Sequence, residues 1–148
     1  MRSFLVRNKT STTNAYPTVK WGMLATNTYF EGDIPVNHSL AISPSKGYII
    51  VDVDRHGKVD GFNNLPDNLL QELANTFSYP TKNNGRHFWF KYTGDKHLIN
   101  KASNQGIDLR TNKGYVIFYP GKPDIRAYID KISSTSIVMN DWLETLFS

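Results

Sequence analysis

The chain has 148 residues, of which 39% are hydrophobic and 13% aromatic, and this composition predicts one folded domain over residues 1–148. It contains no cysteine, which excludes disulfides and thiolate zinc sites and fits a reducing, cytoplasmic location. There is no apolar run of about 18 residues and no secretory signal pattern, so we expect no membrane partner. The formal charge of +4 permits a nucleic-acid or nucleotide partner but does not establish one.

The first part of the chain predicts short strands and turns. The apolar run from Phe4 to Val6 is typical of an edge strand, and a polar loop rich in Ser, Thr and Asn follows it. Pro17 suits the first turn of a short helix that would extend through Leu24. Residues 39–54 predict a β-hairpin, because a strand-like run and a turn that contains proline and glycine precede a second apolar run.

That second run, residues 48–54, reads Tyr-Ile-Ile-Val-Asp-Val-Asp. Side chains alternate across a strand, so Ile49, Val51 and Val53 would bury one face while Asp52 and Asp54 share the other. Two carboxylates this close repel each other unless a cation lies between them, and Mg²⁺ takes such oxygens together with substrate phosphates. The pattern therefore indicates either a divalent-metal site for phosphate chemistry or a strand end whose two acids are merely solvated.

Helices and strands alternate further along the chain. A proline at the start and an aspartate in the first turn predict a helix over residues 66–77. Residues 95–104 are expected to form a short helix and residues 115–119 a strand. Apolar residues at helical spacing over residues 137–147 predict a closing helix packed on the core.

A strand predicted at residues 86–92 follows a glycine turn and carries a histidine. By alternation His87 and Trp89 share one face, whereas Phe88 and Phe90 share the other. An imidazole donates to a phosphate oxygen without a long flexible stem, so His87 suits the triphosphate of an incoming nucleotide. A lone histidine in an aromatic strand is otherwise more often a partly buried one. Trp89 either packs in the core or stacks on a base.

A third carboxylate, Asp108, precedes the next strand and completes a set with Asp52 and Asp54. Roughly three acids can hold two Mg²⁺ or Mn²⁺ ions about 3.5–4 Å apart, the arrangement that clamps both oxygens in nucleotidyl transfer. Taken alone, Asp108 is better explained as a turn residue that is hydrogen-bonded to nearby backbone. Basic side chains near these positions would add charge for nucleotide binding: Lys82, Arg86 and Arg110.

Three motifs stand in order: Val-Asp-Val-Asp-Arg-His-Gly-Lys-Val-Asp-Gly-Phe, Asn-Gly-Arg-His-Phe-Trp-Phe and Gly-Ile-Asp-Leu-Arg-Thr-Asn-Lys-Gly-Tyr-Val-Ile. Together they resemble the bifunctional DNA primase/polymerase (prim-pol) family of the archaeo-eukaryotic primase superfamily, over roughly residues 16–147. The resemblance implies an α+β fold with a primase-type core, an RRM-like mixed β-sheet flanked by helices. It also implies that Asp52, Asp54 and Asp108 bind two divalent cations and that His87 contacts the nucleotide phosphates.

The resulting hypothesis is a DNA primase and polymerase of a phage, plasmid or other mobile element, which adds NTPs or dNTPs on a single-stranded DNA template. The chain has no Walker Gly-x-x-x-x-Gly-Lys motif, so a helicase would be a separate polypeptide or another part of a longer one. Two alternatives stay open. One is a catalytically silent primase-fold module that binds DNA or a protein, and the other is a metal-dependent nuclease, because two-ion geometry can also activate water.

Overall fold

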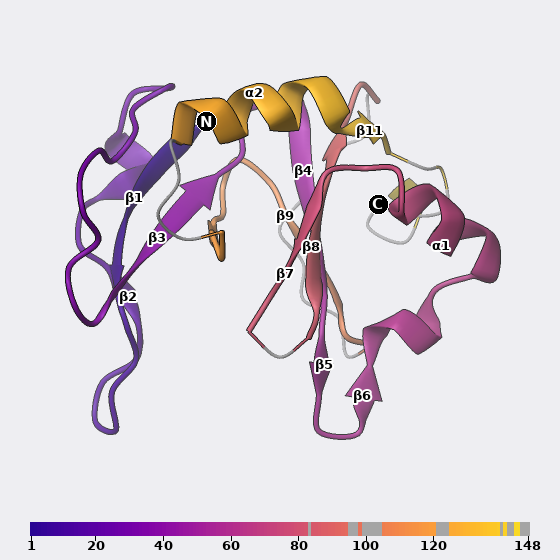
Figure 1. Ribbon diagram of the computed structural model, residues 1–148, viewed down its shortest axis with the longest axis horizontal. Helices are drawn as coiled ribbons and strands as arrows, with labels where there is room; N and C mark the ends of the chain where they lie inside the picture. Colours follow the sequence, from indigo (N-terminus) through magenta and orange to yellow (C-terminus); the bar gives the residue numbers. More distant parts are fainter. Residues whose placement is uncertain are drawn as a thin grey trace.

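The structure is a computed structural model that describes residues 1–82, 84–94, 98, 105–120, 125–139, 141 and 144–145. Its fold is α+β, with a four-stranded sheet, a five-stranded sheet, a separate two-stranded sheet, and α-helices packed beside them (Figure 1). This architecture is that of the expected primase-type core. In the described residues, no helix has the length and apolar character needed to cross a membrane.

The first sheet is antiparallel throughout and has the strand order β10-β3-β1-β2. Its strands are β1 (Arg2–Arg7), β2 (Tyr16–Pro17), β3 (His38–Ser43) and β10 (Val116–Ile117). The edge strand expected near Phe4 is thus present as β1, although it has a neighbour on each side. The short helix expected after Pro17 is a single 3₁₀ turn at Trp21–Met23.

The second sheet is mixed and has the order β11-β8-β4-β9, with β7 also paired to β8. Its strands are β4 (Tyr48–Val53), β7 (Ser78–Pro80), β8 (Arg86–Lys91), β9 (Ile107–Arg110) and β11 (Ile137–Val138). Only β11 pairs in parallel, and the other pairs in this sheet are antiparallel. A small hairpin, β5 (Arg55–His56) and β6 (Val59–Asp60), extends beyond the end of β4 (Figure 1).

The hairpin predicted over residues 39–54 is wrong, because β3 and β4 lie in different sheets. Each of these strands is central in its sheet. β3 pairs with β1 and β10, and β4 pairs with β8 and β9, so neither strand has an edge left for the other. The turn between them therefore carries the chain from one sheet to the next.

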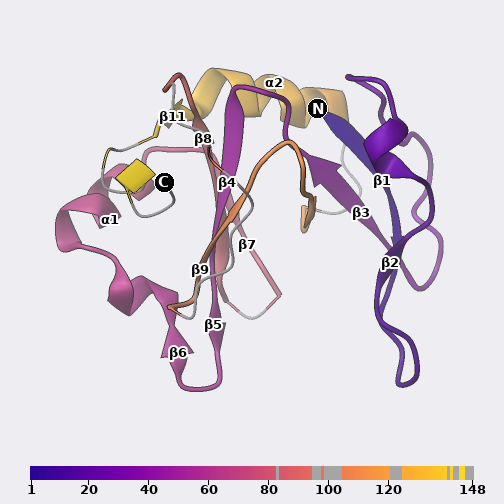
Figure 2. The ribbon, with the colours of Figure 1, turned by 180° about the vertical axis from the view of Figure 1, so that it is seen from behind.

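The alternation predicted for β4 and β8 is confirmed, and it separates two cores. Ile49, Val51, Val53, Phe88 and Phe90 pack with α1 (Asp67–Leu73) on one face of the second sheet. The opposite face carries Ile50 and Trp89, which pack against the first sheet and α2 (Ile125–Thr135). Figure 1 shows the second sheet nearly edge-on between α1 and the first sheet, with α2 across the top, and Figure 2 shows the same layers from behind.

The predicted helices are only partly confirmed. α1 is shorter than expected, since the chain leaves the helix after Leu73 and forms β7 at residues 78–80. The strand expected at 115–119 is the two-residue β10, and a 3₁₀ turn, Gly61–Asn64, precedes α1. The short helix expected at 95–104 lies outside the described residues, apart from Leu98, which is buried.

The closing helix expected from residue 137 is wrong at its start, where β11 runs parallel to β8. The β-branched pair Ile137 and Val138 adds to the edge of β8 instead of beginning a helix. Asp141, Glu144 and Thr145 are helical, and most of the rest of this tail lies outside the described residues. The helix α2 itself was not predicted, although residues 125, 128, 129 and 132 are apolar at helical spacing.

Candidate active site

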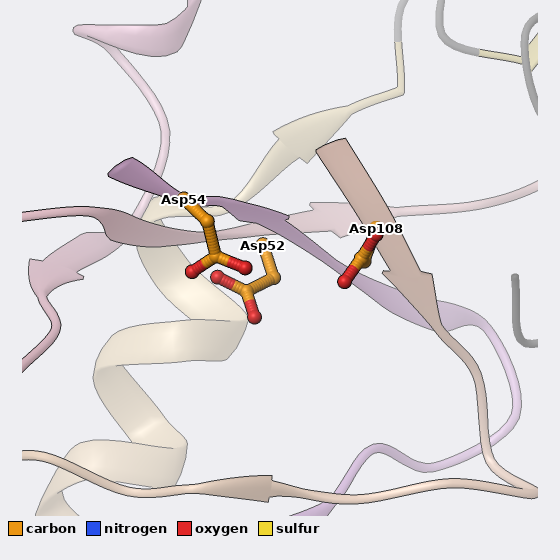
Figure 3. Close-up of side chains that lie close together, drawn as sticks. All are labelled: Asp52, Asp54 and Asp108. Carbon is orange, nitrogen blue, oxygen red and sulfur yellow. The ribbon is translucent and has the colours of Figure 1, made fainter. Parts of the chain in front are cut away.

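The central strand β4 brings the predicted acids together. Asp52 lies directly opposite Asp108 of β9 on one side and His87 of β8 on the other. One carboxylate oxygen from each of Asp52, Asp54 and Asp108 lies within 4.8 Å of the other two, and all three residues are half-buried. Figure 3 shows the carboxylates of Asp52 and Asp54 side by side, with Asp108 reaching the same side from the neighbouring strand. The expected convergence of the three acids is confirmed.

Glycines hold the backbone around Asp54, which follows the last residue of β4. The Asp54 N–H donates to the Gly106 carbonyl at 2.8 Å, and the Gly61 N–H donates to the Asp54 carbonyl at 2.8 Å. A Cβ added at Gly61 would overlap the carbonyl oxygen of Gly106, and one added at Gly85 would overlap that of Val53. These close approaches require glycine, so each of the three sequence motifs contributes a glycine that packs Asp54 in place.

His87 is buried, with 4% of its surface exposed, and it contacts an acid through one nitrogen and a tyrosine through the other. Its Nε2 lies 3.4 Å from Asp52 Oδ1, and its Nδ1 lies 3.1 Å from the Tyr79 hydroxyl. The contact with Asp52 is long for a hydrogen bond, and Oδ1 has no hydrogen-bond partner among the described residues even though the atom is buried. A buried oxygen left in this state is costly unless another partner satisfies it.

This donor set fits a hard divalent cation. All three candidate ligands are carboxylate oxygens, which Mg²⁺ and Mn²⁺ prefer to nitrogen or sulfur. A cation among them would relieve the mutual repulsion of the acids and give Asp52 Oδ1 the partner it lacks. The residues present are therefore suited to binding the ions that the sequence predicted.

The predicted basic residues are not all on the face of the acids. Arg110 is on that face, because it alternates with Leu109 and lies opposite Ile50. Arg86 lies opposite Val53 on the α1 side, where its guanidinium donates to Ser78 Oγ at 2.9 and 3.2 Å. Lys82 is exposed in the turn between β7 and β8. The structure therefore brings Arg110, but not Arg86, to the face that carries the acids.

Trp89 packs in the core. Its side chain is completely buried within the cluster between the two sheets, so no base can stack on it. The alternative that gave it a role in base stacking is thus excluded by the structure.

Two tyrosines of the site were missed. Tyr119 is 41% exposed, and its ring centroid lies 5.8 Å from that of His87. Partial burial, and then the negative charges of Asp52 and Asp54, raise the pKa of Tyr119. Tyr79 comes from β7, in a segment where the sequence predicted only the end of a helix. No motif marks either residue; the pairing of β7 with β8 places Tyr79 beside His87, and a ring contact places Tyr119 there.

The comparisons with known proteins agree with this geometry. The family model described as bifunctional DNA primase/polymerase, N-terminal, matches residues 8–130. The comparison with curated proteins finds no match. Because the family match covers more than half of the chain, the protein belongs to the bifunctional DNA primase/polymerase (Prim-Pol) family.

Proposed function

We propose that the protein is a metal-dependent, template-directed nucleotidyltransferase that adds NTPs or dNTPs on single-stranded DNA. The observation that carries this proposal is the convergence of Asp52, Asp54 and Asp108 within 4.8 Å in a member of the DNA primase/polymerase family. The family supports nucleotidyl transfer in general, and the acids supply the ligands that this chemistry needs.

Asp52, Asp54 and Asp108 would hold two divalent cations, Mg²⁺ or Mn²⁺. Such ions supply Lewis-acid chemistry, which activates the attacking 3′-hydroxyl and neutralises the leaving pyrophosphate. The chain's own contribution is to fix the three carboxylates. β4 is paired along both edges, and the glycines around Asp54 hold the backbone on either side of it, so the ligands are placed before the substrate arrives.

His87 would donate a hydrogen bond from Nε2 to the nucleotide triphosphate, since this nitrogen faces the acid cluster. His87 is almost completely buried, and the ring of Tyr119, which is 41% exposed, lies beside it with the ring centroids 5.8 Å apart. Arg110 and Lys82 would add positive charge from the acid face and from the β7–β8 turn, respectively. We assign no such role to Arg86, because its guanidinium contacts Ser78 on the other face.

An extension assay tests the proposal. The protein is incubated with primed and unprimed templates, labelled nucleotides, and Mg²⁺ or Mn²⁺. We expect product growth in the wild type, its loss in Asp52→Asn, and its retention in Asp130→Asn, which removes an exposed carboxylate on α2. Full activity of Asp52→Asn would refute the mechanism.

The same assay separates the alternatives. Shortening of the labelled strand would identify a nuclease, and binding without any change in length would identify a catalytically silent module. Clustered carboxylates argue against a pure binding role, because they repel the phosphate backbone unless cations neutralise them. An origin in a phage or plasmid and a separate helicase partner are further parts of the proposal that rest on the family resemblance. A single catalytic domain over residues 1–148 and a cytoplasmic location are parts that rest on length, composition and the absence of cysteine.

A further inference from the structure

We propose that Tyr79 is a positioning residue that keeps the ring proton of neutral His87 on Nε2, the nitrogen that faces Asp52 and the proposed metal centre. The effect of this proton position on turnover rests on the function proposed above. The position of the proton itself is a property of the protein without substrate.

The contacts that carry this proposal form a buried chain across β7 and β8. Tyr79 is opposite His87 in the strand register, and its hydroxyl lies 3.1 Å from His87 Nδ1. The same hydroxyl lies 3.3 Å from Nε1 of Trp89. Tyr79 and Trp89 are 5% and 0% exposed, and the rings of Tyr79 and His87 meet edge-on, with centroids 5.3 Å apart. Little water can therefore compete for these polar atoms.

The direction of the hydrogen bonds follows from the chemistry of the three groups. An indole N–H can only donate, so the Tyr79 oxygen accepts from Trp89. The Tyr79 hydroxyl hydrogen then needs an acceptor, and His87 Nδ1 is within reach. Burial raises the pKa of Tyr79 far above its ordinary value, so this hydrogen is retained. A nitrogen that accepts carries no proton, so the neutral imidazole bears its hydrogen on Nε2.

This tautomer matters because of what Nε2 faces. Nε2 is 3.4 Å from Asp52 Oδ1, a buried oxygen that otherwise lacks a hydrogen-bond partner among the described residues. With the proton on Nε2, His87 presents a donor to this carboxylate or to an incoming phosphate oxygen. With the proton on Nδ1, the ring would present a lone pair to groups that are themselves negatively charged. Tyr79 thus acts through His87, whose Nδ1 its hydroxyl contacts.

The direct test is the tautomer of His87, measured by long-range ¹H–¹⁵N NMR on the full chain labelled with [¹⁵N]histidine. The measurement is made without metal or nucleotide, at alkaline pH. The chain has only 4 histidines, and the His87 signals are assigned by their loss in His87→Gln. We expect the Nε2–H tautomer in the wild type and a mixture of tautomers in Tyr79→Phe. A wild type that carries the proton on Nδ1, or a Tyr79→Phe variant with unchanged signals, would overturn the proposal.

The kinetic test compares nucleotide incorporation by the same variants. We expect kcat to fall about three- to tenfold in Tyr79→Phe, the size of one lost hydrogen bond, with little change in the KM for template. The control is Tyr29→Phe, which also removes a hydrogen-bonding phenol, here one that lies 3.0 Å from Asn27 Oδ1. Equal kcat in Tyr79→Phe and Tyr29→Phe would overturn the positioning role even if the tautomer changes.

The two proposals fail separately. An inactive wild type would refute the polymerase proposal, while the NMR spectrum of that wild type would still support or overturn the assignment of the proton. If Tyr79→Phe does not fold, the wild-type spectrum decides, because its assignment depends only on His87→Gln.

Discussion

Replacing Asp54 by Asn should stabilise the metal-free protein and destabilise it relative to the wild type when metal is present. Asp54 shares its site with two other carboxylates, with one oxygen of each within 4.8 Å of the others. Two unit charges at 4.8 Å repel by about 0.9 kcal/mol in water and by about 3.5 kcal/mol at an effective dielectric constant of 20. The substitution removes two such repulsions and keeps nearly the same side-chain shape.

The lower estimate applies because the three acids are half-exposed and the screening length at physiological salt is about 8 Å. Screening roughly halves each repulsion, so we expect the free energy of unfolding in EDTA to rise by about 1 kcal/mol. For a chain of this size that is a rise in Tm of about 2–4 °C. The rise should shrink at high salt, because the repulsion is electrostatic.

Saturating metal should reverse the order of stability, so that the wild type becomes more stable than Asp54→Asn. At a concentration 100 times its Kd, a bound ion stabilises the folded wild type by about 2.7 kcal/mol, and the variant with one fewer ligand gains less. Thermal melts in EDTA and in Mn²⁺ measure both effects, with Asp130→Asn as a control for the loss of a remote carboxylate. A wild-type Tm that does not respond to Mn²⁺, or an Asp54→Asn Tm that falls equally in EDTA and Mn²⁺, would refute the assignment of a metal site.

Three further predictions test other parts of the site. Gly61→Ala should cost about 1–3 kcal/mol of stability, because its Cβ would overlap Gly106, whereas Gly22→Ala has no atom within 4 Å of the new Cβ and should melt like the wild type. Tyr119→Ala should raise the nucleotide KM about threefold or more, whereas the KM of Tyr119→Phe should stay near that of the wild type, since the ring and not the hydroxyl packs on His87. Steady-state kinetics measure both values, and equal KM values for the two variants would contradict the prediction. The raised pKa values of Tyr79 and Tyr119 mean that the folded protein holds these protons more tightly than the unfolded chain, so the free energy of unfolding should fall as the pH rises above about 10. Urea unfolding from about pH 8 to 11 should show a smaller fall in this free energy for Tyr79→Phe than for the wild type. An equal fall in the two proteins would contradict the prediction.

The sequence predicted the acids well because their signal is local. The alternation of Ile49, Val51 and Val53 with Asp52 and Asp54 follows from strand geometry alone, and burial of the apolar set is what the structure shows. The motif order then identified Asp108 and His87 as members of the same site, although they lie on other strands. What made the prediction succeed was the pleat of one strand and the resemblance of three motifs.

The errors that bear on the site concern pairing between distant segments. Residues 39–54 have a plausible hairpin turn, but the partners of β3 and β4 come from elsewhere in the chain and occupy both edges of each strand. Ile137 and Val138 have apolar character that suits a helix, yet the open edge of β8 selects a strand. Tyr79 and Tyr119 could not be predicted for the same reason, because their place beside His87 depends on the register of β7 and on how the two sheets pack.

The position of β4 between β8 and β9 also bears on fragments of this protein. Asp52 meets His87 and Asp108, which follow it by 35 and 56 positions, and a slip of one residue in β9 would exchange Asp108 for an apolar neighbour. A proteolytic piece that ends before Ile107 would keep only two of the three acids and would leave one side of β4 bare. Such a piece would bind divalent cations poorly, and its bare strand would tend to pair with a strand from another copy. Intact ion binding can therefore serve as a quality check on purified material.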